Sequence, residues 1–578
     1  MTSLTRGTGF RRTGVRRTGF RGQGGGWRWG FPALLLLTPF LLWPVAAMLW
    51  RGIAPQGSLS ASVIVDVAGD RFYWGRLGFT TFQALASTAL SLAAGIPAAY
   101  VFARIRFPGR ELARALVTAP FVLPALVVAL AFSQLLGPSG WVNDLLDAVG
   151  LGPLQALGTL WLILLAHAFY NVSVVIRLVS GVWANLDPRT EEAAQLLGAG
   201  RFATFTRVTL PALFPAIASA SALVFTFSFT SFGVILVLGA GGRFLGGPLD
   251  TVEVSIYRLA TRLVELPAAS VLALVQLGTT LSALTLYSAL QRRTATAIEL
   301  GADRARPLRE TSTAERVLLG AVALVLGLLI IAPLAALVVG ALTTGGGGAL
   351  TAANFARLFE DTGRISYVDP VQAVRWSLTF ALGATLGAAV VGMAAATAIS
   401  RTKGPLGPLV DGALMLPLAV PAVVLGFGYL TTFNRGWYDL RGSPWLMLAA
   451  HSLIAYPFVL RAVLAVLRGI DPRLPEAARV LGATPWRVWR FVELPIATRA
   501  LLAGSVFAFA ISLGEFGATL LLRRREFATM PIAIFEALGR PGEINLGRAL
   551  AMATVLLVVT GLSFLAIERF RYGEVAPF

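Results

Sequence analysis

Long apolar runs separated by shorter polar segments fill the chain between residues 31 and 568. Most runs hold about 20 residues or more, the length that a helix needs to cross a hydrocarbon core of about 30 Å. Backbone polar groups must be satisfied inside a spanning segment, so the pattern predicts helices. Twelve spans are expected, at 31–50, 77–103, 113–136, 158–182, 212–239, 266–290, 316–342, 373–399, 408–431, 445–468, 497–521 and 546–568. We therefore predict an all-α polytopic membrane protein.

Two polar segments interrupt this pattern, and they are copies of each other. Residues 187–211 (DPRTEEAAQLLGAGRFATFTRVTLP) align without a gap with residues 471–495 (DPRLPEAARVLGATPWRVWRFVELP) at an offset of 284, with 12 of 25 positions identical. The same offset relates His167 to His451 and Phe232 to Phe516. This spacing predicts a duplicated six-span unit, and an even number of spans per unit makes the duplication parallel rather than inverted.

Each copy is typical of a short helix–turn–helix. In the first copy, Asp187 can cap a helix that starts at Pro188. Gly198 can take the left-handed conformation that ends this helix, and Pro211 restarts a helix into the membrane. The second copy repeats the plan with Asp471, Pro472, Gly482 and Pro495. Such a pair suits docking into a cleft of another protein, whereas a connector resting on lipid headgroups is the alternative.

Composition agrees with a membrane protein. The 578 residues are 56% hydrophobic and 13% charged, with a mean hydropathy of +0.74, whereas soluble domains carry about 25% charged residues. The net charge of +19 comes from arginines in alternate loops, which the positive-inside rule explains better than nucleic-acid binding does. Cysteine is absent, which excludes disulfides and thiolate metal sites.

The predicted organisation has five parts. Residues 1–30 form a basic disordered tail, and 31–290 form the first repeat, whose first span is too long for a signal peptide and is retained. Residues 291–315 form a linker, 316–568 the second repeat, and 569–578 a C-terminal tail. The loop charges place the tails, the linker and both copied segments in the cytoplasm.

Both copied segments resemble the EAA loop (EAA-x3-G-x9-I-x-LP) of permeases from binding-protein-dependent ABC importers. The matching residues are Glu192, Ala193, Ala194, Gly198, Leu210 and Pro211 in the first copy and Glu476, Ala477, Ala478, Gly482, Leu494 and Pro495 in the second. Valine replaces the isoleucine of the pattern in both copies. The resemblance implies two homologous six-helix type I importer permease repeats in one chain, with each loop forming a coupling helix in a cleft of an ATP-binding subunit.

The resemblance also implies partners. We expect a cytoplasmic ABC ATPase subunit in two copies, an extracytoplasmic substrate-binding protein and the lipid of a bacterial inner membrane, and no nucleic acid. A Walker A loop needs a glycine before its lysine, but the chain's one lysine, Lys403, follows Thr402. ATP and Mg are therefore expected on the partner ATPase, with no cofactor or metal on this chain, which is not itself an enzyme.

Fused permeases of this type resemble the thiamine and ferric-iron importers. Three stretches resemble the thiamine branch: LLAHAFYNVSVVIRL (164–178), TVEVSIYRL (251–259) and ISLGEFGATLLLRRREFATMPIAIFEALG (511–539). Val172-Ser173 departs from the Asn-x-Pro of that branch. The expected substrate is thiamine or a phosphorylated form, and ferric iron is the alternative.

Four residues inside the spans are candidates for the translocation path. Glu515 is an acid in an apolar helix, so it faces the bundle interior or the path, and its counterpart in the first repeat is Ser231. Glu515 could guide a cationic substrate. A packing role is favoured, because molybdate and sulfate permeases look similar at this motif although their substrates are anions. Phe232 and Phe516 could line a gate.

The two histidines are a poor pair for a hard ferric ion, so hydrogen-bonded packing is expected for both. An ion-coupled secondary transporter is the rival function, and it predicts several buried acids or broken helices near the midplane. A membrane-embedded enzyme is disfavoured because no nucleophile, base or metal set is clustered in the sequence.

Overall fold

The computed structural model describes residues 29–571 except 55–56, 59, 245–246, 295–304, 345–349, 361–367, 403–405 and 435–438. Almost all of the tail predicted at 1–30, the centre of the linker and most of the tail predicted at 569–578 lie outside the described residues. Within the described part, eleven helices are long and apolar enough to cross a membrane. The predicted all-α polytopic fold is confirmed.

The first half runs from α1 to α14. Its elements are α1 (Phe31–Leu37), η2 (Thr38–Leu42), α2 (Trp43–Ile53), α3 (Ser62–Gly69), α4 (Arg71–Arg104), β1 (Ile105–Arg106), α5 (Arg110–Thr118), η3 (Ala119–Val122), α6 (Ala125–Leu136), α7 (Trp141–Ala148), α8 (Leu160–Asn185), α9 (Pro188–Leu196), α10 (Arg201–Thr204), η4 (Phe205–Thr209), α11 (Leu210–Phe229), α12 (Gly233–Leu238), β2 (Arg243–Phe244), β3 (Gly247–Pro248), α13 (Val252–Arg258), η5 (Leu259–Leu263) and α14 (Leu266–Thr294).

The second half repeats this order. After β4 (Arg306–Pro307) and η6 (Leu308–Glu310) come α15 (Thr313–Leu326), η7 (Gly327–Ile331), α16 (Ala332–Ala341), α17 (Ala353–Ala356), α18 (Pro370–Arg401), α19 (Leu406–Leu414), α20 (Leu416–Ala419), α21 (Ala422–Thr432), α22 (Pro444–Gly469), α23 (Arg473–Val480), α24 (Pro485–Val488), η10 (Trp489–Glu493), α25 (Leu494–Gly514), α26 (Gly517–Leu522), η11 (Arg525–Phe527), α27 (Met530–Leu538) and α28 (Glu543–Arg571).

Two predicted spans are broken at equivalent places. The span expected at 113–136 is divided into α5, η3 and α6, and the one expected at 408–431 is divided into α19, α20 and α21. Proline pairs lie at both breaks: Pro120 and Pro124, and Pro417 and Pro421. Proline lacks the N–H that a helix interior needs and clashes with the preceding turn. The second of these spans is therefore not among the eleven long helices.

The longest helix of each half packs on a neighbouring helix through an equivalent glycine. α4 packs along α8, and α18 packs along α22. A Cβ on Gly95 would lie 2.6 Å from Val175, and one on Gly392 would lie 2.8 Å from Val459. Small residues let membrane helices approach closely and gain van der Waals contact. The same contact thus fixes α4 on α8 and α18 on α22.

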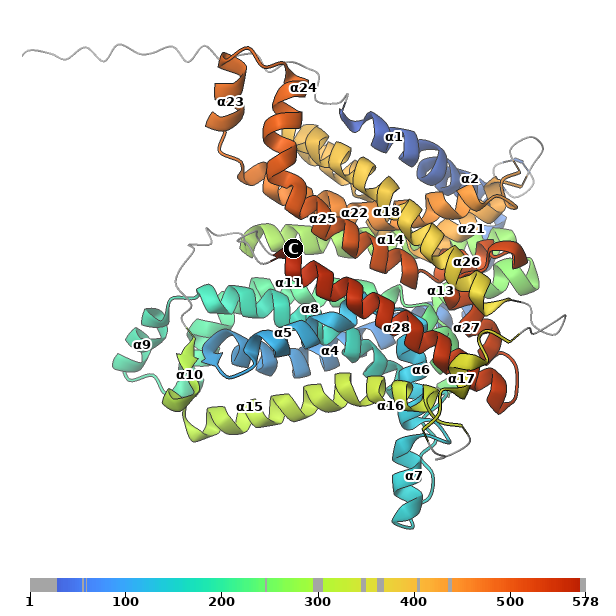
Figure 1. Cartoon of the computed structure of the whole chain (residues 1–578), viewed down its shortest axis with the longest axis horizontal. Coiled ribbons are helices and arrows are strands. Elements are labelled where there is room, and N and C mark those ends of the chain that lie inside the picture. The colour runs from blue at the N-terminus through green and yellow to red at the C-terminus, as the bar shows by residue number, and fades with distance from the viewer. Residues whose placement is uncertain are drawn as a thin grey trace, which may run out of the picture.

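The halves exchange their first helices (Figure 1). α1 packs along α18, and α2 packs against α21, although both belong to the first half. Reciprocally, α15 packs along α4, and α16 packs against α6. A parallel pairing of Ile105 with Arg306 joins β1 to β4, so the segment before α15 is also held on the first half. Each half is therefore completed by a helix from the other.

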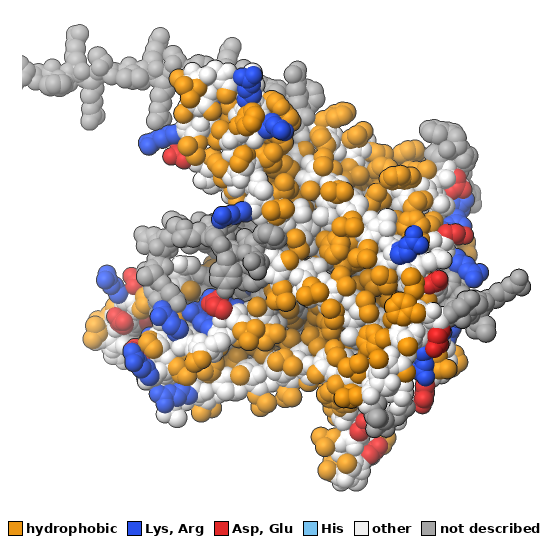
Figure 2. Space-filling model, viewed as in Figure 1, with side chains coloured by type: hydrophobic (Ala, Val, Ile, Leu, Met, Phe, Trp, Pro, Cys, Tyr) orange, Lys and Arg blue, Asp and Glu red, His pale blue; other side chains and the backbone are white. Residues whose placement is uncertain are grey.

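Charged side chains gather at two opposite ends of the molecule, with an apolar face between them (Figure 2). One end carries α9, α10, α23 and α24 (Figure 1), and we call it the EAA end. The first described residues and the end of α28 lie toward this end, whereas α7, α17 and α27 lie at the other. An apolar face between two charged rims is what a hydrocarbon core requires.

Candidate functional site

Each copied segment forms the predicted helix–turn–helix, and we call residues 187–211 and 471–495 the first and second EAA elements. Asp187 accepts a hydrogen bond from the Arg189 N–H at 3.1 Å, and Asp471 accepts one from the Arg473 N–H at 2.9 Å. Gly198 has φ +91° and Gly482 has φ +84°, a conformation that glycine adopts without strain. The predicted turns are confirmed in both copies, and the predicted cap is confirmed in the first. In the second copy Asp471 makes the equivalent hydrogen bond, but α23 starts one residue later than predicted, at Arg473, with Pro472 at the N-cap position.

The second helix of each element differs from its prediction. We expected Pro211 to restart a helix, but Arg201–Phe229 and Pro485–Gly514 are long helices that run from the EAA end into the bundle. A π-helical turn, η4 or η10, precedes Pro211 and Pro495, and both prolines lie in the first turn of the next α-helical segment. Displacement of either element therefore acts directly on α11 or α25.

Large apolar side chains are exposed on both EAA elements. Leu196 and Leu197 are 88% and 89% exposed, and Val480 and Leu481 are each 87% exposed. Glu192 and Glu476 are exposed beside them. The other motif residues are also exposed or half-buried: Ala193, Ala194, Leu210, Pro211, Ala477, Ala478, Leu494 and Pro495. Exposed apolar groups beside polar ones are typical of a protein–protein contact surface.

Ion pairs that the sequence pattern does not reveal hold the base of each element. Arg104, the last residue of α4, lies 3.0 Å from a carboxylate oxygen of Glu191. Arg401, the last residue of α18, lies 2.7 Å from a carboxylate oxygen of Glu493. The offset of 284 does not align the two arginines, because it pairs Arg104 with Ala388, and it does not align the two acids either. The arginines are equivalent because each is the last residue of its helix, α4 or α18.

The candidate path residues lie where two spans are broken. α11 ends at Phe229 and α12 starts at Gly233, so Ser231 and Phe232 lie in the break. α25 ends at Gly514 and α26 starts at Gly517, so Glu515 and Phe516 lie in the equivalent break. Ser231 is half-buried, whereas Glu515 is buried.

The two breaks meet between the halves. The rings of Phe232 and Phe516 are stacked with their centroids 5.7 Å apart. Tyr257 of α13 lies edge-on to Phe232 at 5.6 Å, and Phe535 of α27 lies 5.3 Å from Phe516. We call these four residues the aromatic junction. It brings together equivalent elements of both halves, as an axis of pseudo-twofold symmetry would.

The carboxyl group of Glu515 is hydrogen-bonded within the protein. It accepts hydrogen bonds from the N–H groups of Ala518 at 2.8 Å and Thr519 at 3.0 Å, and from the Thr519 hydroxyl. His451 Nε2 lies 3.6 Å from a Glu515 oxygen. These contacts satisfy the first turn of α26, which a break in a membrane helix would otherwise leave exposed.

Both histidines are buried and hydrogen-bonded, as predicted. His167 Nδ1 lies 2.8 Å from the Ser87 hydroxyl, which joins α8 to α4. His451 Nδ1 lies 2.7 Å from the Ser512 hydroxyl, and its Nε2 lies 2.9 Å from the Thr519 hydroxyl. The two side chains thus tie helices together within their own halves.

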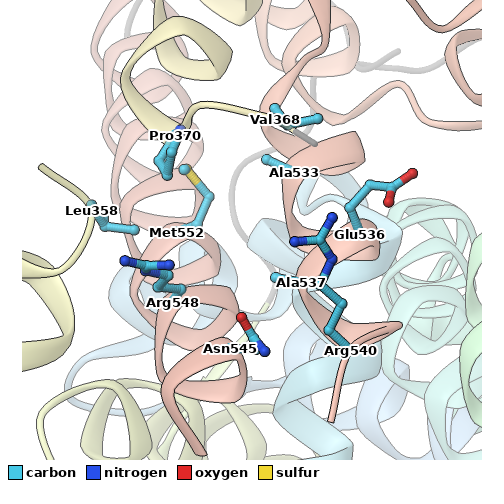
Figure 3. Close-up of a pocket in the computed structure, with 10 residues that line it drawn as sticks. All are labelled: Leu358, Val368, Pro370, Ala533, Glu536, Ala537, Arg540, Asn545, Arg548 and Met552. Atoms are coloured by element: carbon cyan, nitrogen blue, oxygen red, sulfur yellow. The ribbon is translucent and has the colours of Figure 1, made fainter. Parts of the chain in front are cut away.

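A small pocket lies away from the junction between the halves (Figure 3). Its lining residues are Leu358, Val368, Pro370, Ala533, Glu536, Ala537, Arg540, Asn545, Arg548 and Met552. All belong to the second half, at the end opposite the EAA elements. Arg548 is held there by the Arg357 carbonyl at 3.1 Å and lies 3.6 Å from Glu360. The pocket's place within one half does not suit a path between two halves.

Comparison with known proteins agrees with the duplicated fold. A family model described as "Binding-protein-dependent transport system inner membrane component" matches residues 91–296 and 388–570. The chain is 27% identical over 554 residues to the thiamine transport system permease protein of Escherichia coli K12, covering 93% of this chain and 96% of that protein.

Two further matches are more distant or shorter. The chain is 28% identical over 477 residues to the thiamine transport system permease protein of Brucella abortus strain 2308, covering 81% and 83% of the two chains. One chain of a bacterial ABC transporter that imports alginate matches with a TM-score of 0.38 and 19% identity, covering 46% of this chain and 92% of that one. Because the family model matches more than half of the residues, in two separate regions, the chain belongs to the inner-membrane components of binding-protein-dependent transport systems and carries two fused permease repeats.

Proposed function

We propose that this ABC importer permease forms the translocation path for thiamine or a phosphorylated thiamine. The support is the likeness to thiamine permeases along nearly the whole chain, at 27% identity over 93% of it. The pyrimidine and cationic thiazolium rings of thiamine suit contact with aromatic faces, and the aromatic junction supplies four such rings where the halves meet. Substrate would pass when this junction opens.

The observation that carries the coupling part of the proposal is the pair of EAA elements at one end of the molecule. Each presents two almost fully exposed aliphatic side chains beside an exposed glutamate. A separate cytoplasmic ATPase, with one copy on each element, would cover these surfaces and bind the ATP and Mg. An extracytoplasmic binding protein would deliver substrate at the opposite end.

The cycle then follows from the way the elements are joined to the bundle. ATP binding would close the ATPase dimer and draw the two EAA elements together. Each element continues into a long helix, α11 or α25, that reaches the aromatic junction. Movement at the EAA end would therefore separate the halves at the junction and open the path outward, and hydrolysis would reset it.

Uptake of labelled thiamine tests the substrate. Proteoliposomes that contain this chain with its cognate ATPase and binding protein should accumulate thiamine when ATP is present inside. The compound retained by the binding protein on purification should be thiamine or its phosphate. Retention of ferric iron, with no thiamine uptake, would transfer the proposal to the iron alternative.

The charges on the EAA elements test the coupling. Glu192→Lys combined with Glu476→Lys should abolish substrate-stimulated ATP hydrolysis while leaving the amount of protein in the membrane unchanged, because both acids are exposed. Asp144→Lys with Asp147→Lys on α7 makes the same charge change at the opposite end and should leave ATP hydrolysis measured without the binding protein, and the amount of bound ATPase, unchanged. Full stimulation in the glutamate variant would refute the docking role.

The apolar surface of the elements gives a second test. Leu197→Asp with Leu481→Asp should reduce the ATPase retained on affinity purification at least about tenfold, because buried anchor residues of an interface contribute about 2 kcal/mol or more each. Leu145→Asp on α7, where leucine is 66% exposed, is the matched control. Equal retention in both variants would contradict an interface at the EAA end.

Family membership argues against the ion-coupled rival. That rival predicted broken helices, and the breaks at Ser231 and Glu515 do occur. The acid at the second break, Glu515, accepts hydrogen bonds from the first turn of α26, so these bonds already use its carboxyl group. Thiamine transport by this chain alone in liposomes would revive the rival.

A further inference from the structure

One arginine and one acid tie each EAA element to the longest helix of its own half, α4 or α18. The Arg104–Glu191 pair joins α4 to α9, and the Arg401–Glu493 pair joins α18 to the end of η10. The side chains are only 8% and 27% exposed in the first pair and 20% and 12% in the second. Shielded pairs of this kind are less weakened by solvent than the exposed pairs that contribute little to stability.

The acids of the two pairs come from different positions of the repeat. At the offset of 284, Glu191 aligns with Pro475, and Glu493 aligns with Thr209. In the first copy, the Thr209 hydroxyl donates to the same Glu191 oxygen that contacts Arg104, at 2.9 Å. Both positions therefore adjoin the arginine in the first copy, and each half supplies its carboxylate from one of them.

The same ion-pair contact is built from acids at different positions in the two copies. This points to a role for the contact itself. A shared ancestral residue would explain an aligned pair, but here the contact is present in both halves while the acid has changed place. The arginines do not change: each ends an equivalent helix, and each helix packs along the central helices of its half, α8 and α11 or α22 and α25.

We propose that these two ion pairs, which we call the EAA latches, fix each EAA element to α4 or α18 so that displacement of the element moves that helix too. This rests on the proposed coupling function. Without its latch, an element keeps the chain that enters and leaves it, α8 and α11 or α22 and α25. The second element also keeps the hydrogen bond from Trp489 Nε1 to the Thr397 hydroxyl of α18 at 3.3 Å, so the charged contact is what each latch adds. Arg104, Glu191, Arg401 and Glu493 are thus positioning residues, because they act on the path through other groups.

The second latch also reaches the first half. Trp29 lies just before α1, and its ring is 4.6 Å from the Arg401 guanidinium carbon. The same ring stacks on Trp486 at 5.8 Å and lies 5.2 Å from Trp489, both in the second EAA element. At the first half, Tyr100 of α4 donates to Glu315 of α15 at 2.6 Å. The residues around each latch therefore also contact the exchanged first helix of the other half, or the segment just before that helix.

The repeat itself supplies the test. Glu493→Thr removes the acid and recreates the threonine of the first copy. Adding Pro475→Glu then recreates the complete first-copy arrangement, with the acid on the first turn of α23. Proline and glutamate are both tolerated in the first turn of a helix, so the second change should not itself unfold the element. Pro475→Glu alone is the control.

Spin labels report the latch without any partner protein. The chain has no cysteine, so Thr402→Cys and Arg479→Cys give one label at the end of α18 and one on α23. The distance distribution in liposomes should be narrow with the native latch, broad in Glu493→Thr, and narrow again with Pro475→Glu added. An unchanged distribution in Glu493→Thr, or no recovery in the double variant, would overturn the latch.

Thiamine uptake by the complete importer tests the effect on transport. Uptake should fall about tenfold in Glu493→Thr, the size of a typical coupling between sites, and return to within about twofold of the native rate in the double variant. Native uptake in Glu493→Thr would overturn the positioning role. If the native importer takes up no thiamine, the proposed substrate fails, and the label distances still decide whether the latch exists.

Discussion

Glu515 shows what a buried acid does at the scale of one residue. Its carboxyl group accepts from two N–H groups and one hydroxyl, and it lies beside His451. In a medium without water, each unsatisfied donor is costly. The carboxyl group therefore stabilises the break between α25 and α26. The sequence shows only an acid in an apolar run, which does not distinguish this structural role from guidance of a cationic substrate.

Substitution of Glu515 separates these two uses. Glu515→Ala should lower the free energy of unfolding by about 2 kcal/mol, because buried N–H groups lose their acceptor. Glu515→Gln keeps one acceptor oxygen and should lose about half as much. Thermal unfolding of the purified protein in detergent measures both. Normal stability of Glu515→Gln together with lost thiamine uptake would instead support a role toward the substrate.

At the scale of elements, prolines and glycines decide where the sequence is informative. Spans without interruption, such as α8 and α22, lie close to their predicted ranges. The spans predicted at 113–136 and 408–431 are broken because apolar composition persists through Pro120, Pro124, Pro417 and Pro421, so hydropathy alone does not show the break. The first helix and the turn of each EAA element were predicted because a capping aspartate and a left-handed glycine are local features.

The glycine contact between the long helices allows a second prediction. Gly392→Ala should lower the free energy of unfolding by about 1–3 kcal/mol, because the new Cβ would meet Val459 at 2.8 Å and the two helices must separate. Gly278→Ala on α14 is the matched control, since nothing lies within 4 Å of a Cβ there, and it should be neutral or slightly stabilising. Equal losses in the two variants would mean that the contact does not hold α18 on α22.

At the scale of the whole molecule, the halves are joined by exchanged first helices and by the aromatic junction. The duplication was readable from the offset of 284, and Phe232 and Phe516 were expected to line a gate. The exchange of the first helices and the stacking of the two rings on each other were not predicted. Hydrophobic periodicity shows that a helix has apolar neighbours and not which half provides them. The latches were missed for a related reason: their acids occupy different positions in the two copies, so alignment of the repeats separates residues that play the same part.

Opening of the aromatic junction gives a third prediction. Phe232→Ala with Phe516→Ala removes the two rings that stack between the halves and should let a small solute such as thiamine leak through the permease without ATP. Efflux from loaded proteoliposomes measures the leak. Phe82→Ala with Phe491→Ala, which removes two exposed rings elsewhere, should leave the vesicles tight. Tight vesicles with the first variant would place the seal at other residues.

Encoding both halves in one polypeptide has a consequence for how the protein can change. In an assembly of two identical subunits, every substitution is made twice, so an alteration must suit both sides of the axis at once. Among the residues that the structure describes, α7 and the placement of each latch acid occur on one side only. A fused chain can thus specialise one flank for its delivery partner or cargo while the opposite flank keeps its original form.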